Sequence, residues 1–424
     1  MKIFAIILFI AMYIVMIAKS NFRTYAALAV ALIFCIAGIT PIGNIFGAID
    51  FNVLLMIAGT MIVVDYFIES KMPNLIAESL LRHSKNVKMV IILMSLFAGI
   101  VSAFIDNVAT VIMIAPVGLA ICKKLNINPT GMLLSIAVSS NLQGAATLVG
   151  DTTSIMLGAY AKMDFMSFFF VDGKPGIFWA VELGALGTVL VMMILFRKEK
   201  APVSCDSHTK VESLFPSFAL IGIVVFLIAA SFLPKKPDIT NGLICCFIAV
   251  ICMVVDLLRN RKPMSLLHSI KSIDYPTLAL LAGMFVVIAG LQNIGVINDL
   301  ANFIGGLGKN NIFLLYTVIV WMSVLLSAFI DNIPYVATML PVVQSISLSL
   351  GIQPYLLYFG LLSGATLGGN LTPVGASANI AVTGILQKEG YKVSIKEFAK
   401  IGIPFTLTAV VIGYLFIWFV FGPR

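Results

Sequence analysis

The sequence contains the hexapeptide Ser-Ala-Phe-Ile-Asp-Asn twice, at residues 102–107 and 327–332, and each copy lies inside a long apolar run. An aspartate in the middle of a membrane segment is costly, so its presence there indicates function. The two copies stay in register beyond the hexapeptide, because the same offset of 225 also matches Pro116 with Pro341, Thr147 with Thr372, and Gly150 with Gly375. This register predicts an internal repeat with two intramembrane aspartates at equivalent positions.

The composition is typical of a membrane protein. Of the 424 residues, 60% are hydrophobic and 11% are charged, whereas soluble domains carry about 25% charged residues. The net charge of +8 comes from basic residues that flank apolar runs, as membrane insertion favours, so we expect no nucleic-acid partner. The six cysteines show no metal-ligand or disulfide spacing. The sequence therefore predicts an all-α polytopic protein in a lipid bilayer, without a cofactor.

Apolar runs that suit a bilayer-crossing helix of about 20 residues occur in two similar series. The first repeat, 1–196, contains such runs at 3–18, 24–39, 51–68, 129–161 and 176–196. The second repeat, 214–424, contains them at 214–233, 239–257, 276–293, 354–386 and 402–421. The polar segment 197–213 between the repeats is expected to be a cytoplasmic linker.

Each repeat also contains a long apolar run that is broken at its Asp-Asn pair, over 88–122 and 311–348. We expect a re-entrant hairpin with the pair at its tip in each case, although two straight spans would fit the same length. The runs 129–161 and 354–386 carry Gly and Thr near their middles and are expected to be discontinuous helices. With five transmembrane helices in each repeat, the second repeat must be inverted relative to the first.

The basic residues predict the orientation of the chain. With the N-terminus outside, most of the 27 Lys and Arg residues, Arg23 among them, lie in the cytoplasm, in agreement with the positive-inside rule. Those left outside are Lys2, Lys162, Lys174, Lys235, Lys236, Lys309 and Arg424. We therefore expect a multi-pass protein of the plasma (inner) membrane with both termini outside. The two hairpins then enter from opposite sides, and their tips meet near the midplane.

The hairpin tips are the first candidate ion-binding positions. A break in a helix leaves backbone N–H and C=O groups without intrahelical partners, and these groups can face an ion. Asp106 and Asp331 can cap a helix, coordinate Na+ or carry a proton, while Asn107 and Asn332 add amide groups and Thr110 adds a hydroxyl. Because the pairs are duplicated, we favour function over simple capping and expect a Na+ or H+ coupling ion at the two Asp-Asn pairs.

The discontinuous helices supply the facing half of the expected site, because small and hydroxyl residues let the backbone approach an ion and offer oxygen ligands. The candidates are Asn141, Gly144, Thr147, Gly150, Asp151 and Thr152 in the first repeat and Asn370, Thr372, Gly375, Ser377 and Asn379 in the second. A glycine-rich patch can also be a packing seam, and Gly144 fits both interpretations. Ala376 stands at the position that matches Asp151, so the two half-sites are chemically unequal.

Two further acidic residues, Asp65 and Glu182, lie in apolar runs but near their ends, and neither is duplicated. Side chains at such positions reach the membrane interface. We expect both to be solvated rather than part of the ion site.

These motifs resemble those of the ion transporter superfamily, in the branch that joins arsenite permeases, the melanosomal P protein and NhaD-type sodium/proton antiporters. The elements that carry the resemblance are residues 102–111 with Pro116, residues 327–335 with Pro341, and the glycine-rich stretches around Thr147 and Thr372. The resemblance implies a scaffold domain and a mobile transport domain that contains both hairpins and both broken helices. It also implies elevator-type alternating access and a homodimer.

The sister family of divalent-anion/sodium symporters is similar in plan but has Ser-Asn-Thr at the hairpin tips. A tip carboxylate repels a dianion unless it is protonated or sodium-bound. We therefore expect a secondary active transporter, not an enzyme, that couples a proton or Na+ gradient to movement of a small inorganic ion or anion, as in arsenite permeases. A Na+/H+ antiporter is the alternative, and a Na+-coupled carboxylate or sulfate symporter is less favoured.

Two other classes use membrane aspartates. A pair of aspartates can form the dyad of an intramembrane protease, and acidic residues can line a channel. Neither class requires both hairpins and both glycine-rich breaks in matching register, so we disfavour them.

Overall fold

The computed structural model describes residues 1–203, 209–260, 269–307 and 311–423. Part of the expected linker, residues 204–208, lies outside these ranges, as do Lys309 and Arg424 of the charge pattern. The described chain is predominantly helical. Its named strands are the short antiparallel pair β1 (Phe170–Val171) and β2 (Lys174–Pro175), which the sequence did not predict.

The helices follow the order of the apolar runs. Those of the first half are α1 (Lys2–Ala18), α2 (Arg23–Ile36), α3 (Ile45–Ala48), α4 (Phe51–Glu69), α5 (Met72–Arg82), α6 (Val87–Ser102), α7 (Asn107–Leu125), α8 (Thr130–Gly144), α9 (Thr152–Tyr160) and α10 (Ile177–Leu195). Those of the second half are α11 (Phe215–Ser231), α12 (Thr240–Asn260), α14 (Tyr275–Asn293), α15 (Val296–Gly306), α16 (Ile312–Ser327), α17 (Asn332–Leu350), α18 (Tyr355–Gly368), α19 (Ser377–Lys388) and α20 (Ile395–Phe421). Short 3-10 turns are η1 (Ser20–Phe22), η2 (Ile42–Asn44), η3 (Phe165–Phe168) and η4 (Gly369–Leu371).

Seven helices of the described chain are long and apolar enough to cross a membrane, namely α4, α7, α10, α12, α14, α17 and α20. Five shorter apolar helices accompany them: α1, α2, α6, α11 and α16. The chain is therefore a multi-pass, all-helical membrane protein. The last helix begins at Ile395, earlier than the expected 402, because Ser394 and Glu397 form a capping box that starts it there.

Helix starts and ends use matching chemistry in the two halves. Asn86 and Asn311 cap α6 and α16, each accepting a backbone N–H three residues ahead at 3.0 Å. Asn126 and Gly351 adopt left-handed backbone at the ends of α7 and α17, with φ of 54° and 63°, a conformation that stops a helix. A short turn ending at Asp106 separates α6 from α7, and one ending at Asp331 separates α16 from α17.

The helices pack in two groups. We name α1, α2, α4, α11, α12 and α14 the framework group, in which α4 packs on α12 and α2 packs on α14. We name α6–α10 and α16–α20 the hairpin group, in which α6 packs on α8, α16 on α18 and α10 on α20. The short helices α5 and α15 connect the groups, since each follows a framework helix and precedes a hairpin helix.

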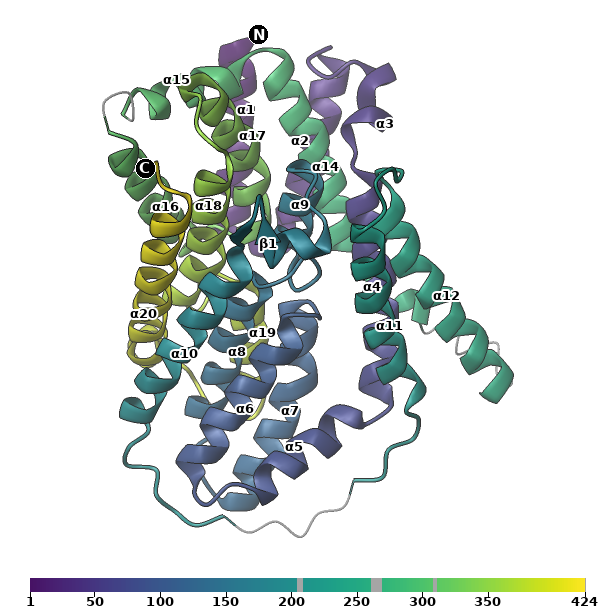
Figure 1. Cartoon of the computed structure of the whole chain (residues 1–424), viewed down its shortest axis with the longest axis vertical. Helices are drawn as coiled ribbons and strands as arrows, with labels where there is room; N and C mark the ends of the chain where they lie inside the picture. The colour runs from purple at the N-terminus through teal and green to yellow at the C-terminus, as the bar shows by residue number, and fades with distance from the viewer. Residues whose placement is uncertain (204–208, 261–268, 308–310, 424) are drawn as a thin grey trace.

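The two hairpins lie toward opposite ends of the molecule. Figure 1 shows α6 and α7 in the half that also contains α5, and α16 and α17 in the half that contains α15 and the N-terminus. The turns of both hairpins, and the breaks between α8 and α9 and between α18 and α19, consequently lie in the middle. This arrangement concentrates the interrupted backbone in one region.

Candidate functional site

A cavity of about 370 Å³ lies between the framework group and the interruptions of the hairpin group. Four helices, α7, α9, α17 and α19, begin at its wall. The free N–H groups at a helix start carry partial positive charge, which stabilises a nearby carboxylate. The charged side chains that line the cavity are Asp65, Asp106, Asp151, Asp274, Asp331 and Arg23.

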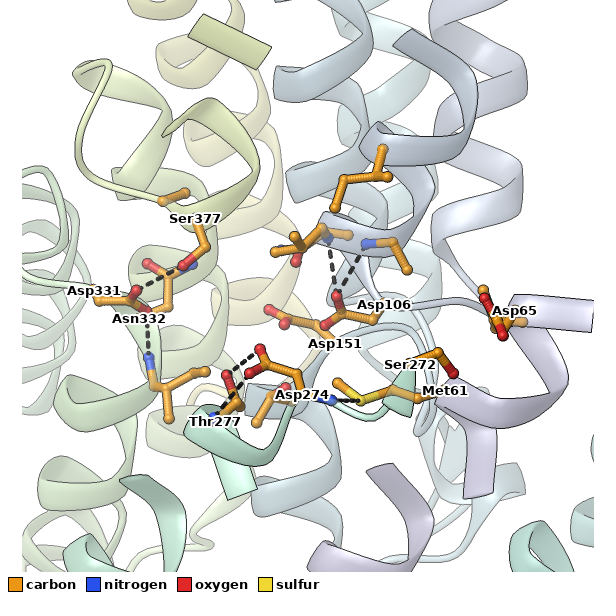
Figure 2. Close-up of a pocket in the computed structure, with 18 of the residues that line it drawn as sticks. Met61, Asp65, Asp106, Asp151, Ser272, Asp274, Thr277, Asp331, Asn332 and Ser377 are labelled. Atoms are coloured by element: carbon orange, nitrogen blue, oxygen red, sulfur yellow. Dashed lines mark hydrogen bonds between the residues drawn. The ribbon is translucent and has the colours of Figure 1, made fainter. Parts of the chain in front are cut away.

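The first half of the cavity is formed by the first hairpin and the first broken helix. Asp106 caps α7 and accepts hydrogen bonds from the backbone N–H groups of Val108 and Ala109, at 3.0 and 3.3 Å. Asp151, only 4% exposed, precedes α9 and accepts a hydrogen bond from the Thr153 hydroxyl at 2.8 Å. Figure 2 shows these two carboxylates close together. Within the described chain neither forms an ion pair.

The second half has the same backbone plan with a different charge. Asp331 caps α17, accepting from the N–H of Ile333 at 3.3 Å and from the hydroxyl of Ser377 at 2.9 Å. The guanidinium of Arg23 forms an ion pair with the same Asp331 oxygen and donates to the Ser377 hydroxyl at 3.1 Å. Ala376, at the position matching Asp151, is buried and contributes no charge. The second half therefore contains a neutralised carboxylate.

The framework group contributes two further aspartates. Asp274 caps α14 through Thr277, accepting from its N–H at 3.1 Å and from its hydroxyl at 2.6 Å, and Figure 2 shows it between the two halves of the cavity. Asp65 lines the cavity from α4. Because Asp274 is solvent-exposed, the cavity is open to solvent beside the start of α14.

Four buried asparagines join the start of α7 and the two broken helices beside the cavity. Asn107 donates to Asn141 at 3.0 Å, and Asn141 donates to Asn370 at 2.7 Å and to Asn379 at 3.0 Å. Asn379 in turn donates to the backbone carbonyls of Gly369 and Thr372. A fully bonded amide network in the interior holds its members in fixed positions. This network therefore fixes the two half-sites relative to each other.

The structure divides the expected site residues into two sets. Those that line the cavity are Asp106, Asn107, Asp151, Thr152, Asp331, Asn332 and Ser377. Those that do not are Thr110, Asn141, Gly144, Thr147, Gly150, Asn370, Thr372, Gly375 and Asn379. The second set holds the backbone together around the cavity.

Two matched contacts illustrate this structural role. The hydroxyls of Thr147 and Thr372 donate to the carbonyls of Ala103 and Ala328, in the hairpin turns. The Thr110 hydroxyl likewise donates to a carbonyl of the first turn, at 3.3 Å. Each of these hydroxyls satisfies a carbonyl that the interrupted helix leaves free.

The glycines allow the broken helices to approach the hairpins. A Cβ on Gly150 would lie 2.7 to 2.9 Å from three backbone carbonyl oxygens, and one on Gly375 would lie 2.6 to 2.9 Å from three others. Only glycine fits such an approach. At Gly144 a Cβ would lie 3.0 Å from the Cβ of Asp151, so this residue belongs to the packing between α8 and the start of α9.

A comparison with known protein families assigns the chain to one of them. The profile of the citrate transporter family, CitMHS, matches residues 6–362. The chain belongs to the citrate transporter family.

Relatives along the whole length agree with this membership. An uncharacterised transporter of Mycobacterium tuberculosis is 31% identical, and the match covers 99% of this chain and 98% of the relative. The human P protein is 25% identical over 96% of this chain and 58% of its own length. The expected kinship with the P protein is confirmed. The family is one of membrane transporters.

Two solved transporters share the fold. The YdaH transporter of Alcanivorax borkumensis superimposes with a TM-score of 0.59 at 14% identity, covering 89% of this chain and 87% of its own. MtrF of Neisseria gonorrhoeae gives a TM-score of 0.59 at 16% identity, covering 92% and 84%. At this identity the likeness concerns the fold alone.

The sequence did not indicate three of the residues that line the cavity, namely Asp65, Asp274 and Arg23. Asp65 was expected to be solvated at a membrane interface, but its side chain lines the cavity. Asp274 shares an offset of 224 with Asp50, which caps α4 as Asp274 caps α14, and this pairing was the available signal. Arg23 was assigned to the cytoplasmic charge of the positive-inside pattern, and nothing in the sequence linked it to Asp331.

Proposed function

We propose that this protein is a secondary active transporter that couples a gradient of Na+ or H+ to the movement of a small solute across the plasma (inner) membrane. The observation that carries this proposal is the cavity at the starts of α7, α9, α17 and α19, which is lined by five aspartates and one arginine. Hard cations prefer oxygen ligands, and carboxylates at membrane depth are typical of ion and proton pathways.

The coupling cation binds in the first half of the cavity. Asp106 and Asp151 provide two carboxylates there without a basic partner in the described chain, and Asn107 and Thr152 add oxygen atoms beside them. A cation between the carboxylates relieves their mutual repulsion, and a proton shared by them does the same. In the second half Arg23 already neutralises Asp331.

Transport proceeds by movement of the hairpin group against the framework group, as an elevator with two inverted repeats. A second cavity of about 520 Å³ between the same groups supports this proposal. It is lined by Asn52 at the start of α4, Tyr160 of α9, Gln292 near the end of α14 and Leu340 of α17. One cavity then is the access path from one side of the membrane to the binding site. The other lies on the access path from the opposite side. We propose a homodimer through the framework group, with both termini outside.

The solute has two candidate classes. A small inorganic ion that is not a multivalent anion, or a neutral hydroxide such as arsenite, suits an acidic cavity. In the alternative of Na+/H+ exchange, the exchanged cations are themselves the transported species. A carboxylate that enters with its cations is the second candidate, favoured by the citrate transporter family profile and by Arg23, a carboxylate-binding side chain in the cavity.

Reconstitution in liposomes tests the proposal. Vesicles loaded with a pH-sensitive dye receive a Na+ or pH gradient and then arsenite, citrate or buffer alone, and the flux of each solute is followed. We expect gradient-driven flux that Asp106→Asn and Asp331→Asn abolish, while both variants fold because Asn is also a good helix cap. Asp299→Asn, which removes a surface ion pair with Lys2, is the control. Unchanged flux in both cavity variants contradicts the proposal.

A further inference from the structure

Arg23 connects the two groups of helices at the cavity. It is the first residue of α2, in the framework group, whereas its partners Asp331 and Ser377 belong to the starts of α17 and α19, in the hairpin group. The side chains of Arg23 and Asp331 are 23% and 19% exposed, so the ion pair is largely withdrawn from solvent. Any movement of one group past the other must break this pair.

The guanidinium nitrogen of Arg23 lies between two oxygen atoms where a metal cation could also bind. One nitrogen of Arg23 contacts both the Asp331 carboxylate and the Ser377 hydroxyl, and these two oxygens are ligands of the kind that a metal cation takes. We propose that Arg23 is an internal stand-in for a second coupling cation, and that it holds the hairpin group in place until a cation displaces it from Asp331 and Ser377. This inference rests on the proposed cation-coupled transport.

The reason is electrostatic. Separating Arg23 from Asp331 without a replacement leaves an uncompensated carboxylate in a partly buried site, which is strongly unfavourable. A cation on Asp331 and Ser377 removes that penalty and moves with the hairpin group, while Arg23 stays with the framework. The pair therefore makes movement conditional on cation binding, and it prevents the cation-free protein from changing state.

The neighbouring contact between the groups lacks this property. The Tyr13 hydroxyl of α1 donates to the carbonyl of Pro334 at 2.7 Å and contacts the Thr338 hydroxyl at 2.8 Å. These bonds are neutral, so a cation does not compete for them. Lys236, between α11 and α12, also forms an ion pair across the two groups, with Asp164 after α9, but both residues lie outside the cavity that contains Asp331. Within this cavity, Arg23 is the residue through which cation binding acts on the interface.

The test measures the position of the hairpin group directly. In a background with all six cysteines replaced by serine, Lys271→Cys before α14 and Gln387→Cys on α19, both exposed, carry spin labels. Electron-electron resonance then gives the distance distribution with N-methylglucamine, with Na+ and at acid pH. In the otherwise wild-type protein we expect one distance without a cation and a second one when Na+ or H+ is added. In Arg23→Gln we expect the second distance without either cation.

A matched control shows whether the change in distance is specific to the Arg23–Asp331 pair or follows the loss of an ion pair elsewhere. Lys123→Gln removes the pair of Lys123 with Glu389, whose two ends both lie in the hairpin group, and should behave as wild type. The inference is overturned if Arg23→Gln and wild type give the same distributions under all three conditions. Should Arg23→Gln fold poorly, Arg23→Lys keeps the charge with a different geometry. A second distance that appears at a different Na+ concentration than in wild type supports the displacement, and an unchanged Na+ dependence contradicts it.

Binding gives a second, independent readout. Removing the internal competitor should raise the apparent affinity of the second cation about tenfold, as expected if the pair is formed about nine times in ten. No change in affinity contradicts the inference. Failure of the proposed function looks different: liposomes of wild-type protein then show no gradient-driven flux, while the distance change in Arg23→Gln persists.

Discussion

The two halves of the cavity share a backbone and differ in charge. In both halves an aspartate caps the second hairpin helix, a threonine hydroxyl holds the hairpin turn, and a glycine lets the broken helix approach it. In the first half, however, Asp151 adds a second carboxylate, whereas the second half has Ala376 and the guanidinium of Arg23. The residues shared by the two halves fix the backbone geometry of the cavity. The residues that differ, Asp151, Ala376 and Arg23, determine the charge of each half.

Repeat symmetry alone therefore does not define the charge of the site. Contacts between residues of the same hairpin and broken helix are local and recur in both halves. The charge balance depends on a side chain from the framework group, which contacts only one half. The first half is therefore suited to accept a cation from solution, while the second half already contains one from the protein.

The largest expected effect is on the first half. Asp151→Asn removes a carboxylate from a buried position and should lower gradient-driven flux at least about thirtyfold, since a charged hydrogen-bonding group contributes about 2 kcal/mol or more. Initial rates in liposomes provide the measurement. Asp172→Asn is the control, because Asp172 has φ of 51° in the β1–β2 turn, a conformation that Asn accepts. If Asp151→Asn lowers the flux by no more than a factor of about two, the loss is far smaller than removal of a charged group should cause. That result would contradict the assignment of Asp151 to the cation site.

The shared backbone predicts equal effects on stability. Gly150→Ala and Gly375→Ala each force a methyl group against three carbonyl oxygens and should each destabilise the protein by about 2–4 kcal/mol. Thermal unfolding in detergent measures this. Gly384→Ala on α19, where a Cβ meets open space, should be neutral or stabilising. A large difference between the first two variants would break the structural equivalence of the halves.

The amide network predicts a smaller loss. Asn141→Ala leaves Asn107, Asn370 and Asn379 without the partner that joins them, and the expected destabilisation is about 1–3 kcal/mol because these groups are buried. The same thermal assay applies, with exposed Asn293→Ala for comparison. If Asn141→Ala keeps full stability and instead abolishes cation binding, Asn141 is a ligand rather than a structural residue.

The smallest effect concerns the segment between the repeats. Lys71 beside Glu212 lowers the pKa of that carboxyl from its ordinary value of 4.5, so the pair contributes to stability above that pH and its contribution is lost as pH falls. Lys71 and Glu212 are both exposed, and exposed ion pairs contribute little to stability. Glu212→Gln should therefore leave flux and the unfolding temperature unchanged at neutral pH. A large loss of flux would extend the working site beyond the cavity.

The sequence predicted the residues that are costly in a membrane. Asp106, Asp151 and Asp331 stand out because each interrupts an apolar run, and all three line the cavity. The helical breaks were also predictable, since the same Gly and Thr positions occur in both repeats. Thr and Asn side chains can satisfy a broken backbone and can also line an ion site, so the sequence could not separate Thr147 and Asn141, which lie outside the cavity, from Asn107, which lines it.

The roles of Arg23 and Asp65 at the cavity depend on tertiary contacts and could not be predicted from the sequence. Arg23 lies 308 residues before Asp331 in the chain, and a basic residue at the start of an apolar run is usual for membrane insertion. Asp65 likewise lies near the end of its run, where side chains commonly reach solvent. Their roles follow from how the framework group packs beside the hairpins, which no local pattern encodes.

Counting the cations taken up per chain tests the inequality of the two halves most directly. Purified wild-type, Asp151→Asn, Asp331→Asn and Arg23→Gln proteins are titrated with radioactive Na+, and protons taken up or released are followed in the same samples. We predict that Asp151→Asn loses the tightly bound cation, that Asp331→Asn retains it, and that Arg23→Gln binds a second cation more tightly than wild type. Equal loss in Asp151→Asn and Asp331→Asn, with no gain in Arg23→Gln, would contradict two unequal half-sites.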